Sequence, residues 1–475
     1  MEIIDTRMAL ADITGLAVFS RLKDHPLIGA LRVLLETCCQ EGAGDALGLV
    51  RGWASFTDAF IRCNQGASFY VTLGLITITD DNPFTHAVEV QNREDLPPVL
   101  VALAKTDLSR LGRIAAVDIP SLGFHLGELL RREGLDSAAQ NIEEEARALW
   151  AVEGKQPRSE REQRVLELFP EKTDWGSSLS ALTTFIHAQG AGLLGLYTSF
   201  RWISSGNARS IDSLQPVFHP DPIGLSDLSG YEDQRMVVTA NTLRFLEGKP
   251  ANNLLLYGDR GTGKSATVKA VSNEYAHQGL RLLEVPKNKL FQLSGILETL
   301  GSRRLRFIIF IDDLSFETTD DSFTSLKALL EGGIEVRPSN VVIYATSNRR
   351  HLVKERLADR PSSAMAAEAL ATGDVRAFDT MQEQFSLADR FGLTVVFTAP
   401  GQEEFLHIAE YIACKRGILK SPLSGDSSQD GPDTEARKIF RDNALRWERW
   451  FNGRSPRTAV QYVDWVTGGE GFPWE

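Results

Sequence analysis

Residues 258–265 have the types and spacing of a loop that binds phosphate groups. Their sequence, GDRGTGKS, matches the pattern G-x-x-x-x-G-K-[ST] at every defined position. Its glycines let backbone N–H groups approach phosphate oxygens, and the N-terminus of a following helix adds positive partial charge. Lys264 supplies a cation for the terminal phosphates, and the Ser265 hydroxyl is a Mg²⁺ ligand. The predicted nucleotide contacts are Gly258, Asp259, Arg260, Gly261, Thr262, Gly263, Lys264, Ser265 and Ala266.

Two carboxylates, Asp312 and Asp313, directly follow the apolar run at residues 307–311. If that run is a parallel strand, both acids lie at the edge of the sheet where ligands bind. Asp312 is then predicted to hold Mg²⁺ through water, and Asp313 to orient or polarise the attacking water. Such a pair is weak evidence alone, and the complete phosphate-binding motif upstream makes the interpretation specific.

The segments that would position these residues alternate between strands and helices from Leu214 onward. This alternation is typical of a parallel sheet covered by helices. Strands are predicted at residues 253–257, 280–285, 307–311, 341–346 and 393–397. A helix at 265–274 follows the glycine loop, and further helices are predicted at 403–416, 434–451 and 456–466. Ser455 and Pro456 have the types expected at the start of the last helix.

The first 205 residues have a different, mostly helical pattern and contain no catalytic constellation. Helices are predicted at residues 28–35, 96–111, 138–150 and 177–202, whereas 69–79 fits either a strand or a buried helix. The acidic run at 143–145 is interpreted as a solvated helix face rather than a metal site.

Length and composition restrict the class of protein. A chain of 475 residues predicts about two to four domains. The net charge of -12 does not favour nucleic acid as a partner, although a local basic face would still allow it. Four cysteines without metal or disulfide spacing fit a reducing compartment. The N-terminal residues lack a secretory pattern and no apolar run could cross a bilayer, so we expect a cytoplasmic protein without a membrane partner.

Six segments of the chain together resemble the AAA+ ATPases. They are HPDPIGLSDLSGYEDQR, ANNLLLYGDRGTGKSATVKA, FIIFIDDLSFE, YATSNRRHL, FSLADRFGL and GRSPRTAVQYV. More closely, they are similar to the uncharacterised bacterial domain-of-unknown-function family 815, and they span more than half of the sequence in that family's order. The resemblance implies ATP and Mg²⁺ as ligands. It also implies an α/β fold: a P-loop core with a five-stranded parallel sheet at 206–400, a helical lid at 401–475, and a separate mostly helical domain at 1–205.

The resemblance also implies roles for further residues. Leu228, in the DLSGY segment, would pack near the adenine, and Asn348 would contact the γ-phosphate or the attacking water. Arg390 corresponds to an arginine finger given to a neighbouring subunit, and Arg457 to the lid arginine that reaches the nucleotide. Arg454 is a second candidate for the lid role. Plainer interpretations remain open: a turn residue for Asn348, a surface or ion-pair residue for Arg390, and a solvated helix residue for Arg457.

One position departs from the AAA+ pattern, because Asp313 stands where most of these ATPases have Glu. Its shorter side chain predicts slow hydrolysis, or transfer of the role to Glu317. A finger supplied by a neighbour makes hydrolysis depend on assembly. The resemblance therefore implies a homo-oligomer, a ring or an open spiral.

Three functions remain open at this level. The preferred prediction is an ATP hydrolase that remodels a protein client, whose identity a nucleotide site does not specify. A helicase-loader-like ATPase would need a nucleic-acid surface, with candidates at residues 303–306, 349–351 and 446–451. The tryptophans of the last candidate could stack on bases or form the apolar face of the lid. The third is a nucleotide-dependent scaffold with little hydrolysis, for which the shorter Asp313 argues.

Overall fold

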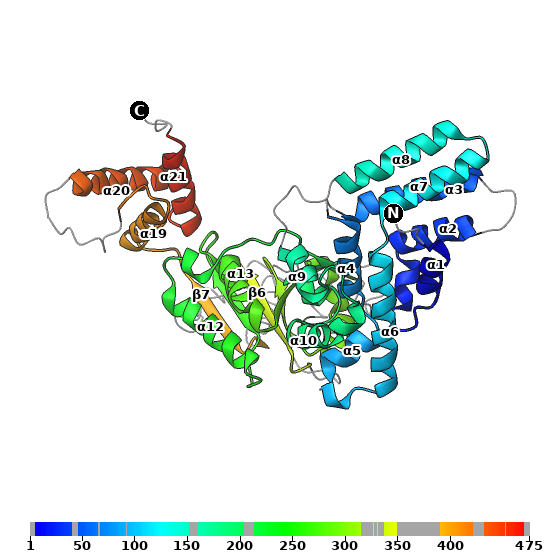
Figure 1. Ribbon diagram of the computed structural model, residues 1–475. Helices are drawn as coiled ribbons and strands as arrows, with labels where there is room; N and C mark the ends of the chain where they lie inside the picture. The colour runs from blue at the N-terminus through cyan, green and yellow to red at the C-terminus, as the bar shows by residue number, and fades with distance from the viewer. Residues whose placement is uncertain are drawn as a thin grey trace, which may run out of the picture. The chain divides into compact units, whose positions relative to one another are not determined.

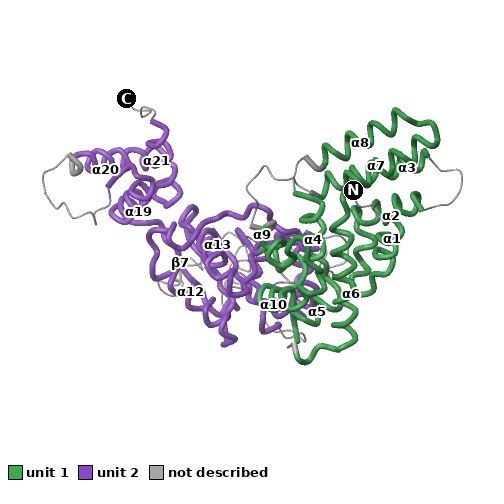
Figure 2. Tube along the Cα trace, viewed as in Figure 1, with its two compact units in different colours: residues 1–197 green, residues 198–475 purple. Residues whose placement is uncertain are grey.

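The computed structural model describes residues 5–39, 46–64, 67–91, 93–151, 160–203, 213–314, 326, 330, 337–348, 390–420, 432–451 and 453–469. The chain divides into two compact units, residues 1–197 and 198–475 (Figure 2). Among the described helices, none combines the length and hydropathy that crossing a bilayer requires.

Unit 1 is helical in all its described secondary structure (Figure 1). Its helices are α1 (Thr6–Thr14), α2 (Pro26–Cys39), α3 (Ala46–Asn64), α4 (Phe69–Thr79), α5 (Pro83–Val90), α6 (Pro98–Ala115), α7 (Ile119–Arg132), α8 (Asp136–Ala151), α9 (Glu160–Leu168), α10 (Leu179–Gln189) and α11 (Leu193–Leu196). The ambiguous segment at 69–79 is thus a helix, and the Ser68 hydroxyl caps it by accepting from the Val71 N–H. Because α4 is buried on most sides, it lacks the one-sided apolar pattern that would have identified it.

One prediction for this part of the chain is wrong, and another holds only in part. Residues 177–202 do not form one helix, because Gly190 and Gly192 take positive φ between α10 and α11. The segment then ends as strand β1 (Ser199–Trp202), which belongs to unit 2. The acidic run is also not a uniformly solvated face: buried Glu143 pairs with Arg131 at 2.7 Å.

Unit 2 contains a seven-stranded sheet in the order β2-β1-β4-β5-β6-β3-β7. All five predicted strands are present, as β3 (Leu254–Gly258), β4 (Leu280–Glu284), β5 (Arg306–Ile311), β6 (Val341–Ser347) and β7 (Leu393–Phe397). They pair in parallel, but β1 and β2 (Leu214–Pro216) extend the sheet beyond β4. Because β2 runs antiparallel to β1, the sheet is mixed. The predicted sheet of five parallel strands is therefore corrected to a sheet of seven described strands, of which β2 is antiparallel.

The parallel strands are apolar runs because helices cover them and remove them from water. Residues 307–311 of β5 and the whole of β6 are buried. Helices α12 (Glu232–Leu246), α13 (Lys264–Tyr275) and α14 (Leu293–Gly301) contact strands of this sheet (Figure 1). The parallel register brings the carboxyl ends of β3, β5 and β6 to one edge, where the predicted site residues lie.

The last three helices within the described residues are α19 (Gln402–Lys415), α20 (Pro432–Trp450) and α21 (Pro456–Gly468). They occur where the sequence predicted them, and they pack through aromatic residues such as Phe440 and Tyr462, whose ring centroids lie 4.9 Å apart. The predicted start of α21 is confirmed, since the Ser455 hydroxyl accepts from the Thr458 N–H at 3.1 Å.

Candidate nucleotide-binding site

The glycine loop joins β3 to α13 with a backbone that only glycine adopts easily. Gly258, Gly261 and Gly263 have φ of 141°, 77° and 89°. A Cβ atom on Gly258 would lie 1.9 Å from the carbonyl oxygen of Phe397 on β7. Glycine is therefore required where β3 passes closely beside β7, and this close approach sets the path of the loop.

The Lys264 side chain folds back over this loop. Its Nζ donates to the carbonyl oxygens of Gly258 at 3.0 Å and Asp259 at 2.6 Å, and it lies 3.4 Å from the Thr262 hydroxyl. The residue is only 4% exposed. The ammonium group is thus held inside the loop by neutral oxygens rather than by a carboxylate contact.

This environment changes the protonation of Lys264. Burial lowers its pKa to about 8, against the opposing charges of Asp259, Asp312 and Asp313 and together with the like charge of Arg457. An anion placed beside the ammonium would favour the charged form again. The loop therefore has the electrostatics of a site for a phosphate chain.

Asp312 connects the end of β5 to the start of α13. Its Oδ1 accepts from the Ser265 hydroxyl at 2.6 Å, from the Thr346 hydroxyl at 2.6 Å and from the Asp313 N–H at 3.1 Å. A carboxylate and a hydroxyl in contact fit Mg²⁺, which binds few protein oxygens and keeps several waters. Ser265 and Asp312 could hold this ion together.

Asp313 is held in an uncommon conformation beside Asp312. Its φ is 51°, in the left-handed region. Its Oδ1 accepts from Asn348 Nδ2 at 2.7 Å, and its Oδ2 lies 3.8 Å from the Nζ of Lys287. Lys287 begins the short helical segment Lys287–Gln292 after β4. No sequence motif marked Lys287, because only the adjacency of β4 and β5 brings it to the acid.

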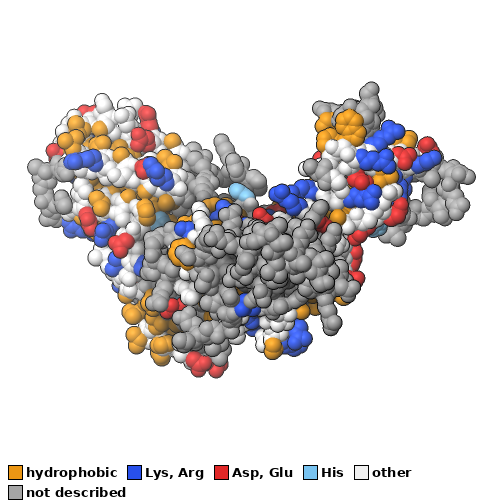
Figure 3. Space-filling model, turned by 180° about the vertical axis from the view of Figure 1, so that it is seen from behind, with side chains coloured by type: hydrophobic (Ala, Val, Ile, Leu, Met, Phe, Trp, Pro, Cys, Tyr) orange, Lys and Arg blue, Asp and Glu red, His pale blue; other side chains and the backbone are white. Residues whose placement is uncertain are grey.

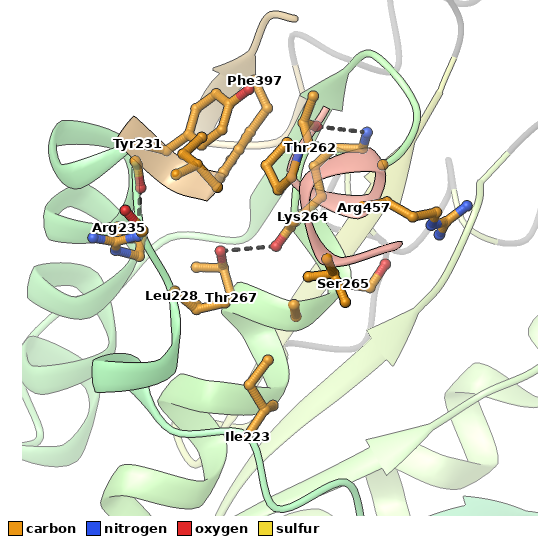
Figure 4. Close-up of a pocket in the computed structure, with 18 of the residues that line it drawn as sticks. Ile223, Leu228, Tyr231, Arg235, Thr262, Lys264, Ser265, Thr267, Phe397 and Arg457 are labelled. Carbon is orange, nitrogen blue, oxygen red and sulfur yellow. Dashed lines mark hydrogen bonds between the residues drawn. The ribbon is translucent and has the colours of Figure 1, made fainter. Parts of the chain in front are cut away.

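A cavity of about 450 Å³ adjoins the loop. Its polar lining includes the loop, both acids, Asn348 and Arg457. Its apolar lining residues are Ile223, Leu228, Tyr231, Phe397, Ile408, Ile412 and Val460. Figure 4 shows Tyr231 and Phe397 together on one side of Lys264 in this view, with Arg457 on the other. A pocket lined by both apolar and charged residues suits a nucleotide, whose base is flat and whose phosphates are anionic.

The structure brings most of the predicted site residues to this cavity. They are Leu228, Arg260, Gly261, Thr262, Gly263, Lys264, Ser265, Ala266, Asp312, Asp313, Asn348 and Arg457. Gly258 and Asp259, at the start of the loop, do not line the cavity, and their carbonyl groups accept from Lys264. Arg390 is not among the residues that line the cavity of its own chain. Arg454 instead pairs with Glu448 at 2.9 Å, and Glu317 lies outside the described residues.

Several lining residues were not found from the sequence. Ile408 and Ile412 are one turn apart on α19, and Val460 is on α21. Arg235 on α12 also lines the cavity and donates to the carbonyl oxygen of Gly230. Their spacing is that of any amphipathic helix, so the sequence has no signal that separates them from core or surface residues.

A strand, a glycine loop that encloses Lys264, and a helix whose Ser265 hydroxyl donates to Asp312 define a P-loop protein of the α/β class. The chain belongs to the family described as Protein of unknown function (DUF815), which matches residues 196–470. The family resemblance drawn from the sequence motifs is thereby confirmed. The match covers the strands of the sheet and the helices α19, α20 and α21.

No curated protein matches this chain. Similar solved structures include a Thermotoga maritima RuvB with a Thr-to-Val substitution, at 16% identity and a TM-score of 0.32, which covers 52% of this chain. The chain spans 65% of that RuvB. Another is a RuvB from the same organism titled a Holliday junction branch migration motor, with 13% identity and a TM-score of 0.28. The match covers 52% of this chain and 72% of that RuvB chain. Likenesses this distant carry no function to the present chain.

Proposed function

We propose that this protein is an AAA+ ATPase that binds ATP with Mg²⁺, hydrolyses it, and uses the cycle to remodel a protein partner. One observation carries the proposal: Asp312 accepts a hydrogen bond from the Ser265 hydroxyl at 2.6 Å. This contact joins the carboxylate after β5 to the phosphate-binding loop, so two predicted magnesium ligands lie side by side. Lys264 and the acid Asp313 line the same cavity.

Each group then has a defined role. The loop amides and Lys264 bind the phosphates, while Ser265 and Asp312 hold the metal. Mg²⁺, when bound, neutralises charge on the phosphates. Asp313 orients the attacking water and accepts its proton as the bond from the γ-phosphorus to the bridging oxygen breaks. Asn348 donates to Asp313 Oδ1 and so fixes the direction of that carboxylate.

In this proposal hydrolysis depends on assembly because of Arg390. We assign it the role of a finger that a neighbouring copy supplies, because the cavity of its own chain is lined without it. A positive charge that arrives only with a neighbour stabilises the developing charge on the transferred phosphoryl group. Hydrolysis would then depend on homo-oligomerisation, in a ring or a spiral.

A nucleic-acid role has less support in the described residues. In the first candidate surface, Arg303 is buried and the Arg306 guanidinium lies over the Phe245 ring at 5.1 Å. In the last candidate surface, Trp447 is buried among the C-terminal helices, whereas Trp450 is exposed. On the face drawn in Figure 3, Lys and Arg side chains are interspersed with acidic and apolar ones. Residues 349–351 lie outside the described part of the chain.

The scaffold alternative has one specific observation in its favour. Asn348 Nδ2 donates to Asp313 Oδ1 at 2.7 Å, and the Lys287 ammonium lies 3.8 Å from Oδ2 of the same carboxylate. A base engaged in this way would act slowly unless nucleotide or partner binding released it. Slow hydrolysis and no hydrolysis are separated by measuring phosphate release at high protein concentration.

The decisive experiment mixes two variants. Lys264→Ala removes nucleotide binding and Arg390→Ala removes the finger, so each should release little phosphate alone. In an equal mixture, about a quarter of random interfaces combine an intact site with an intact finger and should regain activity. Absence of ATP binding by the wild type contradicts the whole proposal. Hydrolysis without complementation contradicts the intersubunit role of Arg390, and binding without hydrolysis favours the scaffold.

Remodelling needs its own test, because the nucleotide site does not reveal which protein partner is remodelled. A partner retained by the wild-type protein should change its assembly state when ATP is added. The Lys264→Ala protein, treated identically, should leave that partner unchanged. Identical behaviour of the two proteins would remove the remodelling part of the proposal.

A further inference from the structure

Thr346, the sixth residue of β6, contacts three consecutive residues that follow β5. Its hydroxyl donates to Asp312 Oδ1 at 2.6 Å and accepts from the Asp313 N–H at 2.9 Å. Its carbonyl oxygen accepts from the Leu314 N–H at 2.6 Å. The side chain is buried, with 2% of the residue exposed. The turn that carries both acids is therefore bound to one residue of the neighbouring strand.

The hydroxyl group is suited to this position because it combines a donor with acceptor lone pairs. A carboxylate needs a donor, and a backbone N–H needs an acceptor. The regular pairing of β5 with β6 runs to Ile311 and Ala345, and Thr346 follows directly. Its side chain thus accepts the Asp313 N–H beyond the ladder and donates to Asp312, the first carboxylate after β5.

The contact with Asp312 selects one orientation of that carboxylate. Oδ1 accepts from the hydroxyls of both Thr346 and Ser265, which lie on different elements. Within the described part of the chain, Oδ2 of Asp312 accepts no hydrogen bond. The orientation that Thr346 stabilises therefore leaves one oxygen available to a metal ion or its bound water.

The contact with Asp313 stabilises an unfavourable backbone. Its φ of 51° costs a residue with a Cβ atom some conformational energy, which surrounding contacts must offset. The bond from its N–H to Thr346 is one such contact, and the bond from Asn348 to its carboxylate is another. Together they hold the Asp313 backbone at its N–H and the Asp313 side chain at Oδ1.

We propose that Thr346 is a positioning residue that sets both acids at once: the carboxylate of Asp312 for Mg²⁺ and the backbone of Asp313 for water activation. The proposal rests on the proposed function, since it assumes that these acids hold the metal and the water. Thr346 itself touches neither ligand in this assignment. Its role is separate from that of Asn348, which contacts only the Asp313 carboxylate.

The test compares Thr346→Val, which removes the hydroxyl and keeps the shape, with Thr346→Ser, which keeps the hydroxyl. Binding of a non-hydrolysable ATP analogue is titrated with Mg²⁺. The Val variant should need about 10- to 100-fold more Mg²⁺ for half-maximal binding, the effect of losing a hydrogen bond to a charged group. The Ser variant should restore the wild-type requirement within about threefold.

Thr242→Val is the matched control. Thr242 is also fully buried in unit 2, and its hydroxyl contacts Tyr344 and the Val238 carbonyl, away from the cavity. This variant should lose stability comparably while its Mg²⁺ requirement stays unchanged. An equal rise in the requirement in both Val variants would mean that Thr346 acts only through general stability, and would overturn the proposal.

A second readout does not need nucleotide. Crystal structures of the two Thr346 variants without ligands should show Asp312 and Asp313 displaced in the Val protein and retained in the Ser protein. Unchanged acids in the Val protein overturn the proposal. A wild-type protein that binds no Mg²⁺-nucleotide contradicts the proposed function instead, and the crystal comparison then decides the positioning role by itself.

Discussion

The backbone N–H of Arg457 donates a hydrogen bond to the carbonyl oxygen of Gly261 at 3.2 Å. Arg457 lies in the first turn of α21, and its N-cap residue Ser455 also packs against Gly261. The start of α21 therefore rests on the phosphate-binding loop. Any rearrangement of the loop on nucleotide binding must move this contact, which is how the C-terminal helices can respond to the ligand.

This contact makes Gly261→Ala a sensitive substitution. The φ of Gly261 is 77°, and a Cβ there would lie 2.9 Å from the Ser455 hydroxyl oxygen and 3.2 Å from Arg457 Cβ. We expect roughly 1–3 kcal/mol of backbone strain and a further 1–3 kcal/mol or so of overpacking. Chemical unfolding, followed by tryptophan fluorescence, measures the loss.

Gly417→Ala is its control, because Gly417 has a similar φ of 74° and no described atom within 4 Å of an added Cβ. The Gly417→Ala variant should lose only the stability that corresponds to the backbone strain, without the overpacking. An equal loss of stability in the two variants would mean that α21 shifts without a loss of free energy and that its contact with the loop is weak.

Nucleotide binding should take up a proton above pH 8. The pKa of Lys264 is lowered to about 8 in the free protein by burial, and a bound phosphate chain favours the charged ammonium. At pH 7 the Lys264 side chain is already protonated in most molecules, whereas at pH 9 it must gain a proton in most molecules before nucleotide binds. The apparent affinity should therefore fall up to about tenfold per pH unit above 8. Calorimetry in buffers of different ionisation enthalpy measures the protons taken up.

Lys264→Arg provides the control, because a guanidinium remains charged throughout this range. Its residual binding should show no proton uptake from this position. Without ligand, the wild-type free energy of unfolding should rise between about pH 8 and 10.5 through this group, because the unfolded chain binds the additional proton there. Proton uptake that is equal in both proteins would assign the titration to another group.

Asp313→Asn should separate binding from hydrolysis. The amide keeps the size of the side chain but cannot accept the proton of the attacking water. We expect phosphate release to fall by about 10²- to 10⁴-fold, with the affinity for ATP nearly unchanged. Steady-state phosphate release and equilibrium nucleotide binding are measured on the same preparation. Retained hydrolysis would transfer the role to another acid, for which Glu317 is the candidate.

Two arginines near the start of α21 form a matched pair. Arg457 lines the cavity, whereas Arg454 pairs with Glu448 at 2.9 Å. Arg457→Ala should weaken ATP binding by about 10- to 100-fold through the loss of a charge-assisted contact. Arg454→Ala should leave the affinity within about twofold, since Arg454 pairs with Glu448 and is not among the residues that line the cavity. Equal effects would show that α21 influences the site through its position and not through the Arg457 side chain.

The sequence predicted the parts of the site that depend on local backbone geometry. The glycine pattern at 258–265 and the strands beside it were correct, because the spacing of glycines and the length of apolar runs are local properties. The cap of α21 by Ser455 was correct for the same reason. By contrast, the role of Arg390 as a finger remains a prediction, since it concerns a second copy of the chain.

Other features depend on which segments become neighbours. Thr346 and Lys287 reach the two acids only because β5 lies between β4 and β6 in the sheet, and the sheet order is not visible in the spacing of residues. Likewise, β1 was taken for the end of a helix, because its pairing with β4 depends on residues far along the chain. The sequence by itself determined the loop that can bind phosphate and the type of its flanking elements. Only the tertiary structure decided which hydroxyl, which ammonium and which apolar side chains surround that loop, because contacts between distant segments follow from packing and not from local preference.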